Sequence, residues 1–143
     1  DITADDENIF ISNSGNNYGN RQNLSVLILD KKNNFNCKGK IEFKYKSQED
    51  FEKRNKHPYD AESIISVGNE LILFSKDRKD LITELYSLPK TSGSYEIEPI
   101  YSYNVNSLIT GSDYSESLSM VALVGYDFTG NQFFYIIKKW TKK

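Results

Sequence analysis

The chain has 143 residues, of which 38% are hydrophobic, 27% are charged and 13% are aromatic, and its formal net charge is −2. This length is typical of one domain with a real hydrophobic core, and the near-neutral charge argues against nucleic acid as the main partner. No apolar run approaches the roughly 20 residues of a membrane-spanning helix, so no membrane span is expected. The single cysteine, Cys37, excludes an internal disulfide and a cysteine-based metal cluster.

Short hydrophobic runs separated by turns rich in Gly and Asn predict β-strands along the whole chain. The expected strands are, in chain order, 9–12, 24–29, 41–46, 71–75, 81–88, 95–103, 121–126 and 132–138. The charged run 76–80 is expected to form a hairpin turn of mixed charge. Only the polar segment 48–56 has a pattern compatible with a helix, and a solvated loop fits it equally well.

One pattern occurs three times: a short segment with an acidic residue, a turn, and a hydrophobic strand. When the hydrophobic strands are aligned, Asp1, Ser63 and Asp113 coincide, and the spacings are about 62 and 50 residues. A repeat of this length, with several short strands in each unit, is typical of β-propeller blades.

We therefore predict an all-β fold of the β-propeller type, with four-stranded blades, in a single domain over 1–143. The blade-like units are expected at about 1–46, 60–103 and 108–138, which amounts to about two and three-quarter blades. Because known propellers close with at least four blades, the ring would be completed by remaining blades of the same protein or by another copy of the chain. A β-sandwich of about eleven strands is the alternative, although it requires no such repeat.

Five motifs occur in an order that resembles one family. The segment 13–24 matches a Gly-Asn-Asn…Asn-Arg…Leu signature, and further matches fall at 57–63, 73–77, 85–90 and 104–113. Together they resemble secreted β-propeller proteins of Bacteroidetes-type bacteria, which mostly have no assigned function. The resemblance implies a secreted or cell-surface location and implies no reaction.

Four acidic residues are expected near the propeller axis, where the innermost strands and the loops before them converge: Asp1, Asp60, Glu62 and Asp113. Convergent carboxylates repel one another unless a cation or a basic group compensates them. Oxygen ligands of this kind are those that Ca²⁺ prefers, so calcium is the one cofactor that the sequence suggests. The alternative is that these acids cap turns and bind water or Arg21.

Four other residues are candidates for ligand binding. Arg21 follows a loop rich in Gly and Asn, and it would bind a phosphate or carboxylate or else pair with an acid such as Asp60 or Glu62. His57, the only histidine, cannot form a two-histidine zinc site; it would act as a general base beside an acid or shape the start of the inner strand. Tyr59 and Tyr114 lie near inner strands, where they would stack on a carbohydrate or a peptide.

The leading hypothesis for function is a noncatalytic binding or interaction domain of a secreted bacterial protein. Its ligand, a carbohydrate, a peptide or a small anion, would sit at the mouth of the channel. The second hypothesis is a calcium-dependent hydrolase of phosphoesters or lactones, with the four acids as metal ligands, and a purely structural spacer is the third. The sequence leaves open whether the protein is an enzyme.

Overall fold

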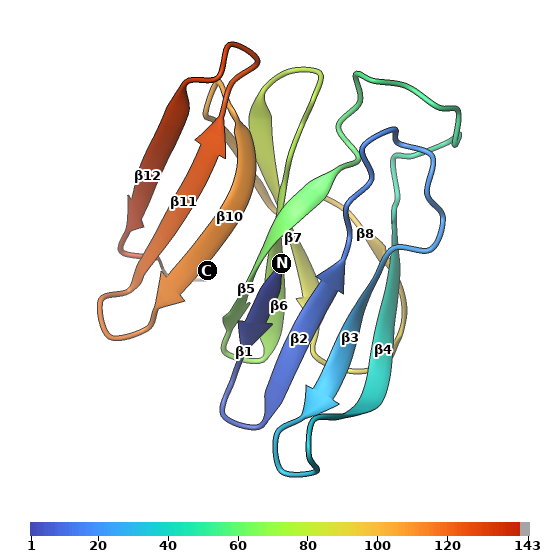
Figure 1. The fold of residues 1–143 in the computed structure, drawn as a ribbon, viewed down its shortest axis with the longest axis vertical. Coiled ribbons are helices and arrows are strands. Elements are labelled where there is room, and N and C mark those ends of the chain that lie inside the picture. Colours follow the sequence, from blue (N-terminus) through green and yellow to red (C-terminus); the bar gives the residue numbers. More distant parts are fainter. Residues whose placement is uncertain (141–143) are drawn as a thin grey trace.

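The computed structural model describes residues 1–140, and these form β-strands and loops arranged in three sheets (Figure 1). The predicted all-β class is confirmed, and 48–56 is a loop. The fold has three sheets, whereas the alternative β-sandwich would have two. None of the described segments is a helix of the length and apolarity needed to cross a membrane. Residues 141–143 of the predicted domain lie outside the described residues.

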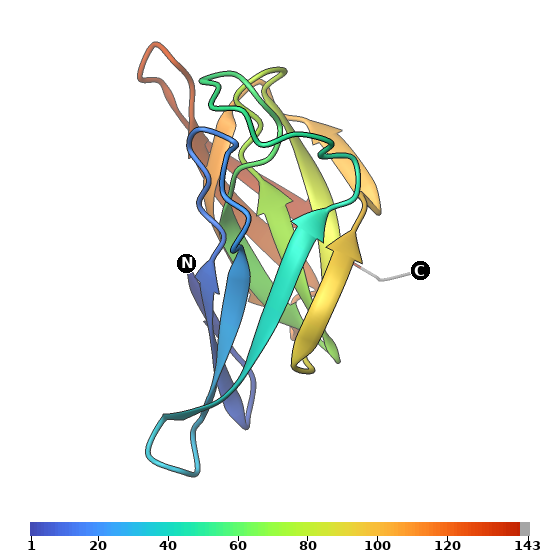
Figure 2. The ribbon, with the colours of Figure 1, turned by 90° about the vertical axis from the view of Figure 1, so that its right-hand side faces the viewer.

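The first sheet has five strands. Four of them, β1 (Ile2–Ala4), β2 (Asn8–Asn13), β3 (Ser25–Asp30) and β4 (Asn36–Tyr45), follow one another as an antiparallel meander. The fifth, β8 (Gly93–Ile97), runs parallel to β4 on the outer edge, as Figure 2 shows. A parallel neighbour requires a long connection, and here the second sheet provides that connection.

The second sheet contains four antiparallel strands in the order β5 (Ala61–Val67), β6 (Glu70–Ser75), β7 (Ile82–Pro89) and β9 (Tyr101–Asn104). It therefore leaves out β8, which lies between β7 and β9 in the chain.

The third sheet is a meander of three described strands, β10 (Leu108–Ser115), β11 (Met120–Tyr126) and β12 (Gln132–Lys138). The sheets of the described chain do not close into a ring.

The prediction of a single strand at 95–103 is wrong, because this segment forms two strands in different sheets. Pro99 lies between them and has no backbone N–H to donate to a ladder, so the strand cannot continue through it. Strand β8, before Pro99, joins the first sheet. There Glu96 Oε1 forms an ion pair with Lys44 Nζ at 2.7 Å. The segment between β7 and β9 thus ties the second sheet to the first.

The second sheet is the middle layer of the molecule (Figure 1), and its two faces contribute to two separate cores. In β6, Leu71 and Leu73 face the core shared with the first sheet, whereas Ile72 and Phe74 face the core shared with the third. Both sets are buried. The continuous hydrophobic run at 71–74 follows from this position, because a strand covered on both faces needs no polar side.

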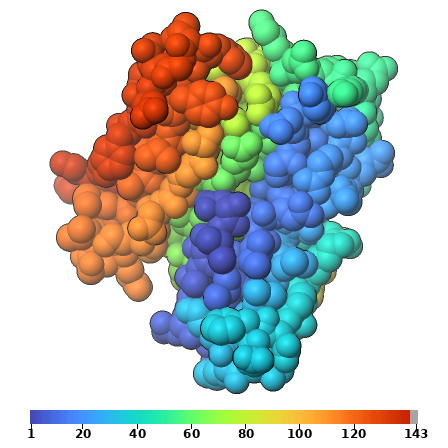
Figure 3. Space-filling view, in the orientation of Figure 1, coloured from blue at the N-terminus to red at the C-terminus, as the bar shows by residue number. Residues whose placement is uncertain are grey.

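The first strands of the three sheets lie side by side, with β5 between β1 and β10. Asp1 Oδ2 accepts a hydrogen bond from the Ile64 N–H at 3.0 Å, and Ser63 and Ser112 share a hydrogen bond between their hydroxyls. The strands that carry the aligned positions 1, 63 and 113 are therefore neighbours. In the space-filling view the N-terminal residues, in dark blue, lie in the middle of the molecule beside the orange third sheet (Figure 3).

Candidate binding groove

Two hollows follow one another along β1, β5 and β10, and together they form what we name the central groove. The first has a volume of about 330 Å³ and takes its lining from all three sheets: Asp1, Ser12, Ser14, Gly15, Ala61, Glu62 and Thr110. The second has a volume of about 440 Å³ and is lined by Ile2, Thr3, Ala4, Ile9, Ser66, Ser112, Asp113 and Tyr114. Hydroxyl and carboxylate groups predominate among the polar side chains of both hollows.

Glu62 in the first hollow is held by a buried lysine. Its Oε2 accepts a hydrogen bond from Lys76 Nζ at 2.7 Å, and Lys76 is only 4% exposed. The ammonium also lies 5.3 Å from the centre of the Tyr126 ring. This pairing compensates the buried lysine and fixes the carboxylate at the wall of the hollow. The run 76–80 connects the antiparallel strands β6 and β7, as expected of a hairpin turn, and its Lys76 and Asp77 are both buried.

The hydroxyl groups of the first hollow form a short chain of hydrogen bonds. The Ser12 and Ser14 oxygens are 2.6 Å apart, and Ser14 donates to the Ala61 carbonyl oxygen at 2.7 Å. These bonds connect the end of β2 with the start of β5, so they fix the wall of the hollow between the first two sheets.

The second hollow is lined by an exposed acid and by a tyrosine, which are consecutive residues of β10. Asp113 is exposed, and its Oδ1 accepts only the N–H of Tyr114 at 2.9 Å among the hydrogen bonds seen for it in residues 1–140. The Tyr114 ring packs against the core between the second and third sheets. On the opposite wall Thr3 accepts the Ser66 N–H at 3.1 Å. The hollow therefore offers an acceptor, a ring and hydroxyls within one strand-lined space.

The four acids predicted to bind calcium are not all brought together. Asp1 and Glu62 line the first hollow and Asp113 lines the second, whereas Asp60 lies outside the groove. Asp60 is fully buried and accepts hydrogen bonds from the Asn16 N–H at 2.6 Å and from Arg78 Nε at 2.9 Å. Across residues 1–140 no three His, Cys, Asp or Glu side chains form a group that could hold a metal ion. The calcium hypothesis stays a prediction without geometric support.

Arg21 holds its own loop and does not pair with Asp60. It donates from Nη1 to the Gly15 carbonyl oxygen at 2.5 Å and from Nη2 to Asn13 Oδ1 at 3.0 Å. Asp60 takes Arg78 as its partner instead. Sequence reasoning missed this pairing, because Arg78 lies in the charged run 76–80, which was expected only to form a hairpin turn.

His57 and Tyr59 also lie outside the central groove, and both make structural contacts. The Nδ1 atom of buried His57 accepts the Tyr59 N–H at 3.1 Å, so Nε2 carries the proton and donates to the Asn17 carbonyl oxygen at 3.2 Å. The imidazole ring packs so closely on Gly19 that an added Cβ would approach it to 2.9 Å. Tyr59 donates its hydroxyl to the Ser47 carbonyl oxygen at 2.9 Å. Of the four predicted ligand-binding residues, only Tyr114 lines the groove.

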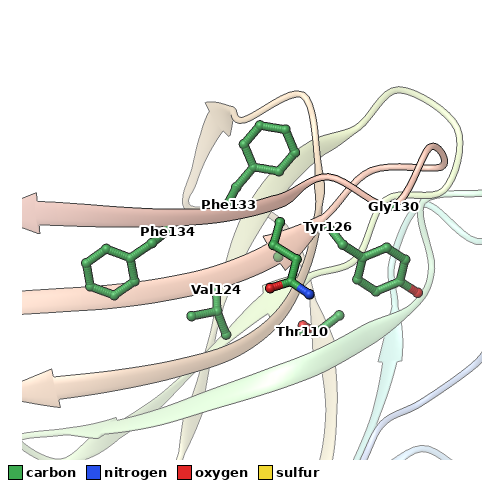
Figure 4. Close-up of a pocket in the computed structure, with 8 residues that line it drawn as sticks. Thr110, Val124, Tyr126, Gly130, Phe133 and Phe134 are labelled. Carbon is green, nitrogen blue, oxygen red and sulfur yellow. The ribbon is translucent and has the colours of Figure 1, made fainter.

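A third hollow lies on the third sheet and is the most apolar of the three (Figure 4). Its volume is about 560 Å³, and its apolar walls come from Val124, Tyr126, Phe133 and Phe134. Sequence reasoning missed this surface. The signal was present at 133–137, where five consecutive apolar or aromatic residues leave no polar face on a strand at the edge of the sheet.

Comparison with known proteins assigns no family to the chain: neither a scan against protein families nor a search of curated proteins gives a match. The class of protein is therefore defined by fold and site alone. It is an all-β protein whose three sheets place their first strands around a polar groove.

Proposed function

We propose that the chain is a noncatalytic carbohydrate-binding domain, that its scaffold is of the β-propeller type, and that it belongs to a secreted or cell-surface bacterial protein. The scaffold is supported by the contact of β5 with both β1 and β10, because the innermost strands of propeller blades converge in this way. The location is supported by the resemblance of the motifs at 13–24 and 104–113 to secreted bacterial propellers.

The observation that carries the proposal is the lining of the central groove. Glycan hydroxyls donate well to carboxylates such as that of Asp113 and accept from serine and threonine hydroxyls, while the apolar face of a sugar ring packs on an aromatic ring such as that of Tyr114. Carboxylates on both hollows disfavour an anionic ligand. A neutral oligosaccharide therefore fits this lining better than the small anion considered from the sequence.

The hydrolase hypothesis has less support than simple binding. Calcium-dependent hydrolysis would require several carboxylates to converge on one ion. Asp60 is occupied by Arg78, Asp1 by the Ile64 N–H and Glu62 by Lys76. Asp1 and Asp113 are both exposed, but they line different hollows, and two separated carboxylates do not make a calcium site.

A titration with neutral oligosaccharides tests the proposal. Xylohexaose, cellohexaose and maltohexaose are each added to the ¹⁵N-labelled protein, and backbone amide shifts are followed. We expect at least one of them to shift amides of β1, β5 and β10 as a group. Absence of such shifts with all three sugars at millimolar concentration would refute the proposal.

Variants then assign the contact to the groove. Tyr114→Ala and Asp113→Ala are each expected to weaken sugar binding about tenfold or more. Tyr101→Ala is the matched control, because Tyr101 is an exposed tyrosine on β9 and lies outside both hollows. Equal weakening by all three variants would place the sugar elsewhere.

A further inference from the structure

The face of the third sheet that points away from the second sheet is apolar, and no other part of residues 1–140 covers it. Phe134 is 66% exposed and Val124 is 45% exposed, and the two residues are directly opposite in the β11–β12 ladder. Tyr126 and Ile136 extend the same face along the two strands and are exposed as well. We name these four residues the apolar strip; Figure 4 shows its Val124, Tyr126 and Phe134 side chains. Four large exposed apolar residues on one sheet face are typical of an interaction surface.

The position of the strip indicates that the partner is another β-sheet. The second strand of each sheet alternates its side chains between the two faces. In β2 Phe10 faces the second sheet, and in β6 Phe74 faces the third sheet. In β11 Val124 lies on the corresponding face, opposite to Leu123 and Val121, which pack back on the second sheet. The strip therefore continues the series of interfaces by which each sheet packs on the next.

The first sheet carries the complementary surface at the other end of the stack. Ile9 and Leu29 are opposite each other in the β2–β3 ladder, as are Ile11 and Leu27, and all four point away from the core between the first two sheets. They are half-buried, and the neighbouring Ile2 is 61% exposed. This face corresponds to the one that β6 presents to the first sheet. One chain thus holds both halves of a sheet–sheet interface, on opposite outer layers.

We propose that the apolar strip of one copy of this chain docks on the outward face of β2 and β3 of a second copy. Because the two surfaces differ, each contact is head-to-tail. Two copies related by a twofold axis would form this contact twice, in a closed ring, and would cover both strips and both first-sheet faces. Such a dimer would contain six packed sheets and no uncovered apolar sheet face among the described residues.

Sedimentation velocity across a concentration series tests this proposal. The chain is expected to sediment at twice the mass of one copy at about 100 µM, where an interface with a micromolar dissociation constant is saturated. Phe134→Glu removes the strip and Leu27→Lys removes its partner face, so each variant alone is expected to be monomeric. Their equimolar mixture keeps one of the two contacts, because each variant still offers the surface that the other has lost. It is therefore expected to associate into a heterodimer that is weaker than the wild-type dimer.

Two controls keep the test decisive. Tyr101→Glu changes an equally exposed aromatic on the second sheet and is expected to leave the dimer intact. Ile2→Lys replaces Leu27→Lys if the latter does not fold, which circular dichroism establishes. A wild-type chain that stays monomeric at 100 µM, or variants that dimerise like the wild type, would each overturn the proposal. A monomeric wild type would point to a different chain segment or a different protein as the cover of the strip.

Discussion

Arg78 Nε lies 2.9 Å from Asp60 Oδ2, and this ion pair joins three segments that are far apart in the chain. Asp60 also accepts the Asn16 N–H, and Arg78 also donates to Asn17. The loop after β2, the start of β5 and the hairpin after β6 are therefore fastened to one carboxylate. Because Asp60 is fully buried, its charge depends on these donors for compensation.

We expect Asp60→Ala to lower the free energy of unfolding by about 3 kcal/mol, since it leaves the Arg78 guanidinium and the Asn16 N–H without their acceptor. Urea denaturation measures this loss. Asp80→Ala is the control, because Asp80 is exposed and pairs only with exposed Lys79 among the ion pairs of the described chain. Its effect should stay within about 0.5 kcal/mol. Equal losses for the two variants would contradict the structural role of Asp60.

The Lys76–Glu62 pair should show a measurable coupling energy. In a double-mutant cycle with Lys76→Met and Glu62→Gln, we expect the two losses of stability to be non-additive by about 1 kcal/mol, because the lysine is buried and its carboxylate partner is only partly solvated. The pair formed by Lys32 and Glu7, which is open to solvent on both sides, is the matched control and should show additivity. A zero coupling energy for the buried pair would be inconsistent with the contact at the groove wall.

Gly125 marks a close approach between β10 and β11. A Cβ added there would lie 2.5 Å from the Leu108 carbonyl oxygen, which is backbone and cannot turn away. Gly125→Ala is therefore expected to lower the free energy of unfolding by about 1–3 kcal/mol. Gly15→Ala is the comparison, since no atom lies within 4 Å of the added carbon at that position. Similar melting temperatures for both variants would show that the two strands do not approach this closely.

Asp127 should titrate well below an ordinary aspartate. The Asn131 side chain and then the Thr129 hydroxyl donate to its carboxylate, backbone N–H groups of the same two residues add to this, and together they lower its pKa to about 2. Because the folded pKa lies below the unfolded value of about 3.9, the turn is stabilised above pH 4 and loses this contribution as the pH falls towards 2. Carboxyl ¹³C shifts should give the low midpoint, and Asn131→Ala should raise it. An unshifted midpoint in both proteins would rule out the hydrogen-bonded turn.

The all-β class and the hydrophobic strands were predictable because their signals are local. The hydrophobic run at 71–74 and the alternation of apolar and polar residues at 41–46 each predict a strand from a few neighbouring residues. The alignment of Asp1, Ser63 and Asp113 also placed their strands in equivalent positions, and the structure has those strands side by side. Such internal similarity is visible in a sequence because each unit repeats one local pattern.

The contacts that depend on distant segments were not predictable in the same way. The parallel pairing of β8 with β4 requires the chain to return to the first sheet after three strands of the second, and no local pattern encodes that return. The same is true of the Asp60–Arg78 pair, for which the sequence suggested Arg21 as the arginine partner. Of the groove lining, the sequence pointed to Asp1, Glu62, Asp113 and Tyr114. The separation of Asp60 from these residues appears only in three dimensions.

Intermolecular nuclear Overhauser effects between a bound neutral hexasaccharide and the aromatic protons of the protein test the central claim most directly, because they identify the ring that touches the sugar. The claim is that the groove between β1, β5 and β10 is the binding site. We predict effects from sugar ring protons to the Tyr114 ring. Effects confined to Tyr59 or Phe134, or none at all with the sugar in saturating excess, would contradict the account.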